Sequence, residues 1–212
     1  MELLHDRDIR EPLFDFLEET YGKVRILEEK TMGRSRADAV MVTESGLYGI
    51  EIKSDADGYA RLARQIGDYD LYYDYNYAVI GTSHAAHIEE RLPLWWGIIT
   101  VEAVEREADF YILRKPLPNP KMDWNRKISI LWRPELARIQ KRNHLPEYKE
   151  KSKLFVQRKL LEKIPGPVLS AELSQELFER DYTLIGEQID AFRSQKERPA
   201  GTPRRKRRRR HG

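Results

Sequence analysis

Cysteine is missing from this chain of 212 residues. Its absence excludes disulfide bonds and thiolate metal ligands, and it favours a reducing compartment. The sequence also has no run of about 18 apolar residues, so it predicts no membrane span. The N-terminal MELLHDRDIR carries acids early and has no apolar core, which argues against a secretory signal. We therefore expect an intracellular, cytoplasmic protein with no membrane partner; the oligomeric state cannot be deduced from the sequence.

Charge is plentiful but unevenly distributed. The whole chain has a formal net charge of +3, yet residues 196–212 alone contain nine Lys or Arg and one Glu. The other 195 residues carry 29 basic and 34 acidic groups, a net charge of −5. A tail this charged, with no apolar residue larger than Ala, cannot fold alone and would bind polyanions non-specifically. The same pattern is typical of nuclear targeting. Its run of basic residues is Arg204, Arg205, Lys206, Arg207, Arg208, Arg209 and Arg210.

The most informative stretch is RADAVMVTESGLYGIEIK, residues 36–53. It holds two runs of strand-forming residues, 39–43 and 47–52, joined by Glu44-Ser45-Gly46. Two such runs separated by so few residues containing Gly predict an antiparallel hairpin. Charged residues on these otherwise apolar strands need a physical reason, because burying them unpaired is costly.

The register of the hairpin provides that reason. Glu51 and Lys53 are two residues apart, so they share one face of their strand. Asp38 lies opposite Glu51 if Glu44-Ser45 is the loop, and opposite Lys53 if Ser45-Gly46 is the loop. Either register gathers all three side chains on one face.

Two carboxylates and a lysine on one face are the components of a Mg²⁺ site. Carboxylates directly opposite each other repel unless a cation lies between them. Their hard oxygen ligands would leave positions open for water and phosphate. The alternative is a surface hairpin with a solvated ion pair.

The order Asp38, twelve residues, then Glu51-Ile52-Lys53 resembles the active-site motif of the PD-(D/E)XK nuclease superfamily. The resemblance covers roughly residues 8–103. Ala37 replaces the Pro of the name motif. The resemblance implies that Asp38 and Glu51 bind Mg²⁺ or Mn²⁺, with the Ile52 carbonyl as a further ligand. It also implies that Lys53 orients or helps to deprotonate the attacking water.

The same resemblance suggests two auxiliary residues. Many members place a metal-proximal Glu on the first helix, which would be Glu11 here, and a Gln or Lys on the helix after the hairpin, which would be Gln65. Glu11 has a structural alternative as a first-turn acid that favours the helix dipole. Gln65 has one as a solvated residue of a helix face.

Three arginines near the motif are candidates for contacts with nucleic acid. Arg34 and Arg36 stand shortly before Asp38 in the sequence, and Arg61 precedes Gln65 by one helical turn. Their ordinary alternative is to balance nearby acids. The cluster of tyrosines at 69–77 could stack on bases, but its helical spacing favours packing in the core.

The remaining pattern predicts an α/β fold. We expect helices at 8–20 and 59–74, and strands at 24–31, 39–43, 47–52, 77–82, 97–103 and 110–115. Further helices are expected at 133–143 and 151–164, with Pro165-Gly166-Pro167 as a break and a last helix capped by Ser170. The expected architecture is a restriction-endonuclease-like core (helix, three-strand meander, helix, strand) with a mixed central sheet flanked by helices. The expected domains are this core at 1–115, a helical accessory region at 116–195 and a disordered basic tail at 196–212.

The sequence thus predicts a metal-dependent nuclease that hydrolyses phosphodiester bonds, in DNA rather than RNA, with Asp38, Glu51 and Lys53 as its catalytic residues. The competing hypothesis is a non-catalytic protein of the same fold that binds nucleic acid or recruits a partner. An intact set of repelling carboxylates argues against that alternative, whereas the basic tail fits both.

Overall fold

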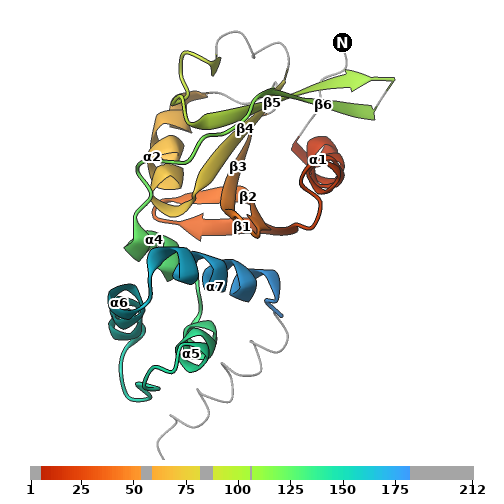
Figure 1. Ribbon diagram of the computed structural model, residues 1–212. Helices are drawn as coiled ribbons and strands as arrows, with labels where there is room; N and C mark the ends of the chain where they lie inside the picture. Colours follow the sequence, from red (N-terminus) through yellow and green to blue (C-terminus); the bar gives the residue numbers. More distant parts are fainter. Residues whose placement is uncertain (1–5, 54–58, 82–87, 106, 182–212) are drawn as a thin grey trace, which may run out of the picture. The chain divides into compact units, whose positions relative to one another are not determined.

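The computed structural model describes residues 6–53, 59–81, 88–105 and 107–181 (Figure 1). Its elements follow the chain as α1 (Asp6–Tyr21), β1 (Arg25–Met32), β2 (Ser35–Thr43), β3 (Gly46–Lys53), the 3-10 helix η1 (Tyr59–Arg61), α2 (Leu62–Tyr72), β4 (Tyr75–Gly81), β5 (Trp96–Val104), β6 (Glu107–Arg114), α4 (Trp124–Ser129), α5 (Arg133–Arg142), α6 (Lys153–Lys163) and α7 (Gly166–Phe178). The expected order of helix, three strands, helix and strand is therefore confirmed.

The six strands form one mixed sheet in the order β1-β2-β3-β4-β5-β6. The first three strands pair antiparallel, as hairpins do, while β3–β4 and β4–β5 pair parallel and β6 returns antiparallel to β5. The parallel pairing of β3 with β4 requires a crossover, and α2 makes it. The α/β class and the mixed sheet are thus confirmed.

Helices cover both faces of this sheet, α1 on one face and α2 on the other (Figure 1). Two hydrophobic clusters correspond to these faces. One joins α1 to β2–β5 through residues such as Leu13, Met41 and Val79. The other joins α2 and the C-terminal helices to the opposite face, through residues such as Val42 and Leu173. The side chains of β3 alternate between the two clusters. Its even-numbered residues face α1, and its odd-numbered residues face α2.

Helix α1 is amphipathic, as its sequence predicts. Ile9, Leu13 and Leu17 recur every four residues and are buried against the sheet. The helix ends where Gly22 adopts a φ of 74° and its N–H donates to the Glu18 carbonyl at 2.8 Å. Only glycine adopts this left-handed conformation without strain.

The β2–β3 hairpin takes the first of its two possible registers. Its pairs run from Thr43↔Gly46 to Ala39↔Ile50, so Glu44-Ser45 is the loop. Continuing this register by one residue places Asp38 opposite Glu51. The two acids therefore meet directly across the hairpin.

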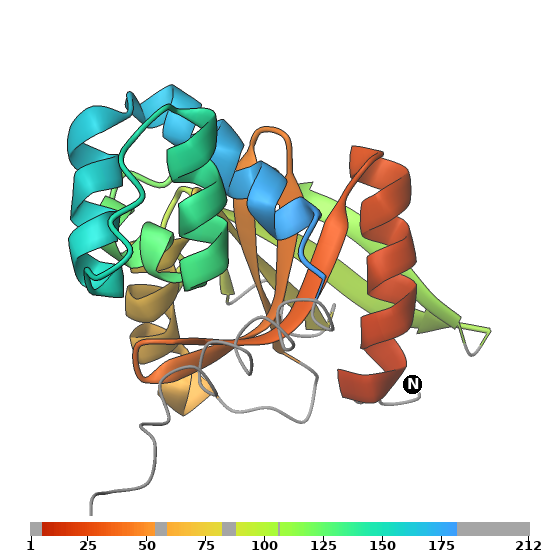
Figure 2. The ribbon, with the colours of Figure 1, turned by 90° about the horizontal axis from the view of Figure 1, so that it is seen from below.

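The C-terminal helices α4–α7 gather beside α2 and the β1–β3 end of the sheet (Figures 1 and 2). Lys127 of α4 is fully buried, and its ammonium donates to Asp74 at 2.7 Å and to Ser170 at 2.9 Å. The expectation that Ser170 caps the last helix is therefore wrong. Helix α7 begins at Gly166 with Pro165 as its N-cap residue, because Pro167 is tolerated in a first turn.

Residues up to Glu179 form one compact unit. The boundaries expected at residues 115 and 195 stay predictions, as does the disorder expected of the basic tail, which lies outside the described residues. In the part of the chain that the structure describes, no helix is long and apolar enough to cross a membrane.

Candidate active site

Glu51 lies at the centre of a buried polar cluster at the end of β3. Its side chain is 1% exposed. Lys53 Nζ and Gln65 Nε2 both donate to its Oε1 atom, while the Tyr69 hydroxyl lies 2.7 Å from its Oε2 atom. Strand alternation brings Lys53 to this face, and helical spacing brings Gln65 and Tyr69 to it one turn apart. The sequence predictions for Glu51, Lys53 and Gln65 therefore meet in one place.

Asp38 approaches the same cluster from the neighbouring strand. Its Oδ2 atom accepts a hydrogen bond from the Ile52 amide at 2.8 Å. Arg10 of α1 donates to the Asp38 carbonyl at 3.2 Å, and its guanidinium lies 3.7 Å from Asp38 Oδ1. Arg10 also lies 3.6 Å from Glu28. The Asp38 side chain is thus tied to β3 and to α1, with Oδ1 the less tightly held oxygen.

The protonation of Asp38 is shifted by these surroundings. Burial, followed by the nearby Glu51 carboxylate, raises the pKa of Asp38 to about 7, although the Ile52 amide, Lys53 and Arg10 each act to lower this pKa. Burial also raises the pKa of Tyr69, and the two carboxylates add to that effect. A bound cation would favour the ionised form of Asp38, because an opposite charge at short range lowers a carboxyl pKa.

Both acids open onto a polar pocket of about 290 Å³. Its wall contains four arginines, a lysine and the two carboxylates, and its lining residues are Arg34, Ser35, Arg36, Asp38, Glu51, Ile52, Lys53, Arg61, Arg64 and Gln65. The three arginines expected from the sequence all lie here. Arg64 was not predicted, although its place one turn after Arg61 would have indicated it.

The arginines of this pocket differ in how they are paired. Arg36 forms an exposed ion pair with Glu29 at 3.2 Å. No hydrogen bond or ion pair joins Arg34, Arg61 or Arg64 to another residue of the described part of the chain. Their positive charge is therefore available to an anionic ligand.

The two walls of the pocket are fastened to each other. The turn between β1 and β2 is held to α2 because Ser35 Oγ donates to Asp68 and the Gly33 amide donates to the Tyr72 hydroxyl at 3.0 Å. Gly33 has a φ of 55°, and a Cβ there would lie 2.8 Å from Asp68 Oδ1. This turn therefore needs a glycine, and its contacts with α2 hold the segment that carries Arg34.

The donor set fits a magnesium or manganese ion. Asp38 and Glu51 supply two carboxylates, and the Ile52 carbonyl lies on the residue between Glu51 and Lys53. Among the described residues no group of three or more His, Asp or Glu side chains could hold a metal. Two carboxylates are nevertheless the usual protein share of a Mg²⁺ site, since this ion keeps several waters.

Not every predicted residue joins this cluster. Glu11 is exposed on α1 and does not line the pocket, whereas the adjacent Arg10 reaches Asp38. The basic residues 204–210 lie outside the described residues. Tyr69 was expected in the core, and it is buried there, but its hydroxyl also takes part in the site.

Comparison with known protein families gives a match that covers residues 1–193. The matching family model is described as bacteriophage P4 protein cII. This chain belongs to that family. The match thus connects the chain with a phage protein family and carries no indication of a nuclease. Neither the curated proteins nor the solved structures compared with the chain gave a match.

Proposed function

We propose that this protein is a metal-dependent nuclease that hydrolyses phosphodiester bonds, with DNA as its substrate rather than RNA. The observation that carries the proposal is the content of one pocket. Asp38, Glu51 and Lys53 line it together with three arginines that have no partner among the described residues. Carboxylates suit a hard cation and arginines suit phosphate, so the pocket combines the groups that a phosphodiester substrate and its metal need.

The fold supports the same proposal. A helix, three antiparallel strands, a crossover helix and a fourth strand parallel to the third follow each other in α1 to β4. This is the order expected of a restriction-endonuclease-like core, and the candidate residues lie on β2, β3 and α2 of it. The arrangement is an analogy of fold, which supports a function only together with the site.

Each residue has a distinct role in this proposal. Asp38 and Glu51 would hold Mg²⁺ or Mn²⁺, with the Ile52 carbonyl as a further ligand. The ion, when bound, supplies a hydroxide-like nucleophile and stabilises the charge that develops on the phosphate. Lys53 orients the attacking water and offsets charge on the phosphate, and Gln65 holds Glu51. The arginines bind the phosphates next to the bond that is cleaved.

A second candidate function is a nucleic-acid-binding protein without catalysis. One observation favours it. Glu51 accepts hydrogen bonds from Lys53, Gln65 and Tyr69, so protein donors alone meet the hydrogen-bonding needs of both oxygens of this carboxylate. A site of this kind would bind nucleic acid through its arginines and would not depend on a divalent cation.

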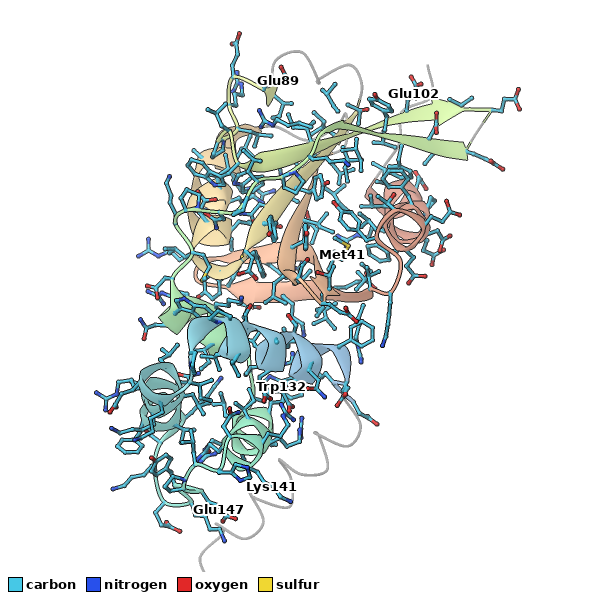
Figure 3. All side chains as sticks on the ribbon, viewed as in Figure 1. Met41, Glu89, Glu102, Trp132, Lys141 and Glu147 are labelled. Carbon is cyan, nitrogen blue, oxygen red and sulfur yellow. The ribbon has the colours of Figure 1, made fainter. Side chains whose placement is uncertain are left out.

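A cleavage assay separates the two. Wild type, Asp38→Asn and Glu51→Gln would be incubated with plasmid, linear duplex DNA, single-stranded DNA and RNA, each with Mg²⁺, Mn²⁺ or EDTA. Glu102→Gln is the matched control, since this exposed carboxylate lies on β5 away from the site (Figure 3). We expect cation-dependent cleavage by wild type and Glu102→Gln only.

The preferred substrate would then identify the kind of nuclease. Cleavage of RNA in preference to every DNA substrate would correct the substrate class but keep the site. Tight binding without cleavage, unchanged by Asp38→Asn or Glu51→Gln, would contradict the proposal and favour the binding protein.

A further inference from the structure

Tyr69 is a buried side chain whose hydroxyl contacts three atoms of the site. The residue is 0% exposed. Its oxygen lies 2.7 Å from Glu51 Oε2, 2.9 Å from the Ile50 carbonyl oxygen and 3.3 Å from the Asp38 amide nitrogen. One hydroxyl therefore touches the Glu51 carboxylate and the backbone of both strands that carry the acids.

The hydroxyl lies where pairing between the two strands ends. The register of β2 and β3 stops at Ala39↔Ile50, one residue before Asp38 and Glu51. Beyond that point the strands are joined by side chains, through the Asp38 carboxylate and the Tyr69 hydroxyl. The spacing between the two acids thus depends on groups other than the strand ladder.

The ring of Tyr69 is held firmly in its place. It packs edge-on against Tyr73, with ring centroids 5.6 Å apart, and at a tilt against Trp96, 5.4 Å away. Gly49 lies beneath it, and a Cβ there would come within 2.6 Å of the Tyr69 ring. A fixed ring gives a fixed hydroxyl, so the oxygen stays beside Glu51 Oε2.

The opposite oxygen of Glu51 is the one directed to the pocket. Its Oε1 atom contacts Lys53 and Gln65, both of which line the pocket, whereas Tyr69 is not among the lining residues. The carboxylate is thereby held with Oε2 against the buried Tyr69 hydroxyl and Oε1 beside the two donors that line the pocket.

We infer that Tyr69 is a positioning residue for the cation-binding carboxylates. Its hydroxyl orients Glu51 so that Oε1 faces the pocket, and it sets the separation of β2 and β3 at which Asp38 and Glu51 bind one ion. This inference rests on the proposed function, because it needs a cation at these two acids. Groups that orient a metal ligand typically contribute 10–100-fold to metal affinity.

The test compares Tyr69→Phe with Tyr73→Phe in the full-length protein. Both changes remove one hydroxyl and keep a buried ring, and Tyr73 is 1% exposed beside Tyr69. Mn²⁺ affinity would be measured by electron paramagnetic resonance of the free ion, without substrate. Thermal unfolding in EDTA would show whether each variant folds, and the rise in melting temperature on adding Mn²⁺ gives a second readout of affinity.

We expect Tyr69→Phe to weaken Mn²⁺ binding by roughly 10–100-fold while Tyr73→Phe keeps the wild-type affinity. Equal affinities of the two variants, with wild-type binding intact, would overturn the inference and leave the proposed function standing. A wild type that binds no Mn²⁺ would contradict both. If Tyr69→Phe loses stability in EDTA but keeps its Mn²⁺ affinity, the hydroxyl has a structural role only.

Discussion

Asp38 is a carboxylic acid whose charge depends strongly on its surroundings. Its pKa of about 7 reflects burial and the neighbouring Glu51 carboxylate. An unfolded Asp titrates near 3.9. Between these two values the unfolded chain loses the Asp38 proton while the folded chain keeps it, so this group makes folding less favourable as the pH rises from about 4 to about 7.

This difference predicts a pH dependence of stability without metal. In EDTA, the free energy of unfolding should fall as the pH is raised from 5 to 8, and the fall should be smaller in Asp38→Asn. The Asp38 contribution is at most about 1.4 kcal/mol for each unit of pKa difference. Adding Mg²⁺ should restore more stability at pH 8 than at pH 5, because the ion binds the ionised carboxylate. Urea unfolding of both proteins at each pH measures these effects. Identical pH profiles for wild type and Asp38→Asn would contradict this view of Asp38.

At the scale of elements, the site depends on how closely α2 approaches β3. Gly49 on β3 lies under two tyrosine rings, that of Tyr69 in α2 and that of Tyr73 at the C-terminal end of this helix. A Cβ at Gly49 would come within 2.2 Å of the Tyr73 ring and 2.6 Å of the Tyr69 ring. Gly67 is the natural comparison, since it lies within α2 and a Cβ there would meet nothing within 4 Å.

We expect Gly49→Ala and Gly67→Ala to change stability in opposite directions. Gly49→Ala should cost roughly 1–3 kcal/mol, because an added methyl in a packed core forces its neighbours to shift. Gly67→Ala should stabilise by roughly 0.5–1 kcal/mol, since alanine is the better helix former. Denaturant unfolding measures both. A Gly49→Ala variant as stable as wild type would show that α2 can move away from the sheet at little cost.

Arg34, Arg61 and Arg64 line the pocket and are expected to bind phosphates of the nucleic acid. Replacing Arg34, Arg61 and Arg64 by Gln should lower the slope of log affinity against log salt by about 0.9 for each lost phosphate of duplex DNA. Arg126→Gln with Arg158→Gln is the control, because these exposed residues lie on α4 and α6. Fluorescence anisotropy in EDTA at several salt concentrations gives the slope. Equal slopes for the wild type and the three-residue variant would place the nucleic acid elsewhere.

The elements also show how far sequence could predict this site. Side chains alternate between the two faces of a strand, so Glu51 and Lys53 were expected on one face of β3. The short hairpin loop then leaves few registers, and each of them brings Asp38 to the same face. Gln65 was indicated by the resemblance to the nuclease superfamily, which implies a Gln or Lys on the helix after the hairpin. Glu11 and Arg10 could not be told apart in this way, since the rotation of α1 against the sheet is set by burial of Ile9, Leu13 and Leu17.

Other parts of the structure left no clear signal in the sequence. The helical pattern of Tyr69 fits a core residue and a site residue equally, because its ring is in the core while its hydroxyl reaches Glu51. Ser170 looked like a helix cap, yet it is a partner of the buried Lys127, a contact across 43 residues that no local pattern contains.

At the scale of the whole molecule, the acidic body and the basic tail have different expected tasks. We predict that replacing the seven basic residues at 204–210 by Gln weakens nucleic-acid binding and lowers its salt slope by up to roughly six. Cleavage at low salt should persist, because the pocket is built from residues 34–65. Anisotropy and cleavage assays on the full-length variant test this. Lost cleavage at a concentration where the variant still binds would assign the tail a role in catalysis.

The most direct test of the central claim, that Asp38 and Glu51 form a divalent-cation site, is a calorimetric titration of the full-length protein with Mn²⁺. We predict saturable binding by wild type and by Glu102→Gln, and its loss in Asp38→Asn and in Glu51→Gln. No binding by the wild type, or binding that both substitutions leave unchanged, would contradict the claim and with it the proposed nuclease.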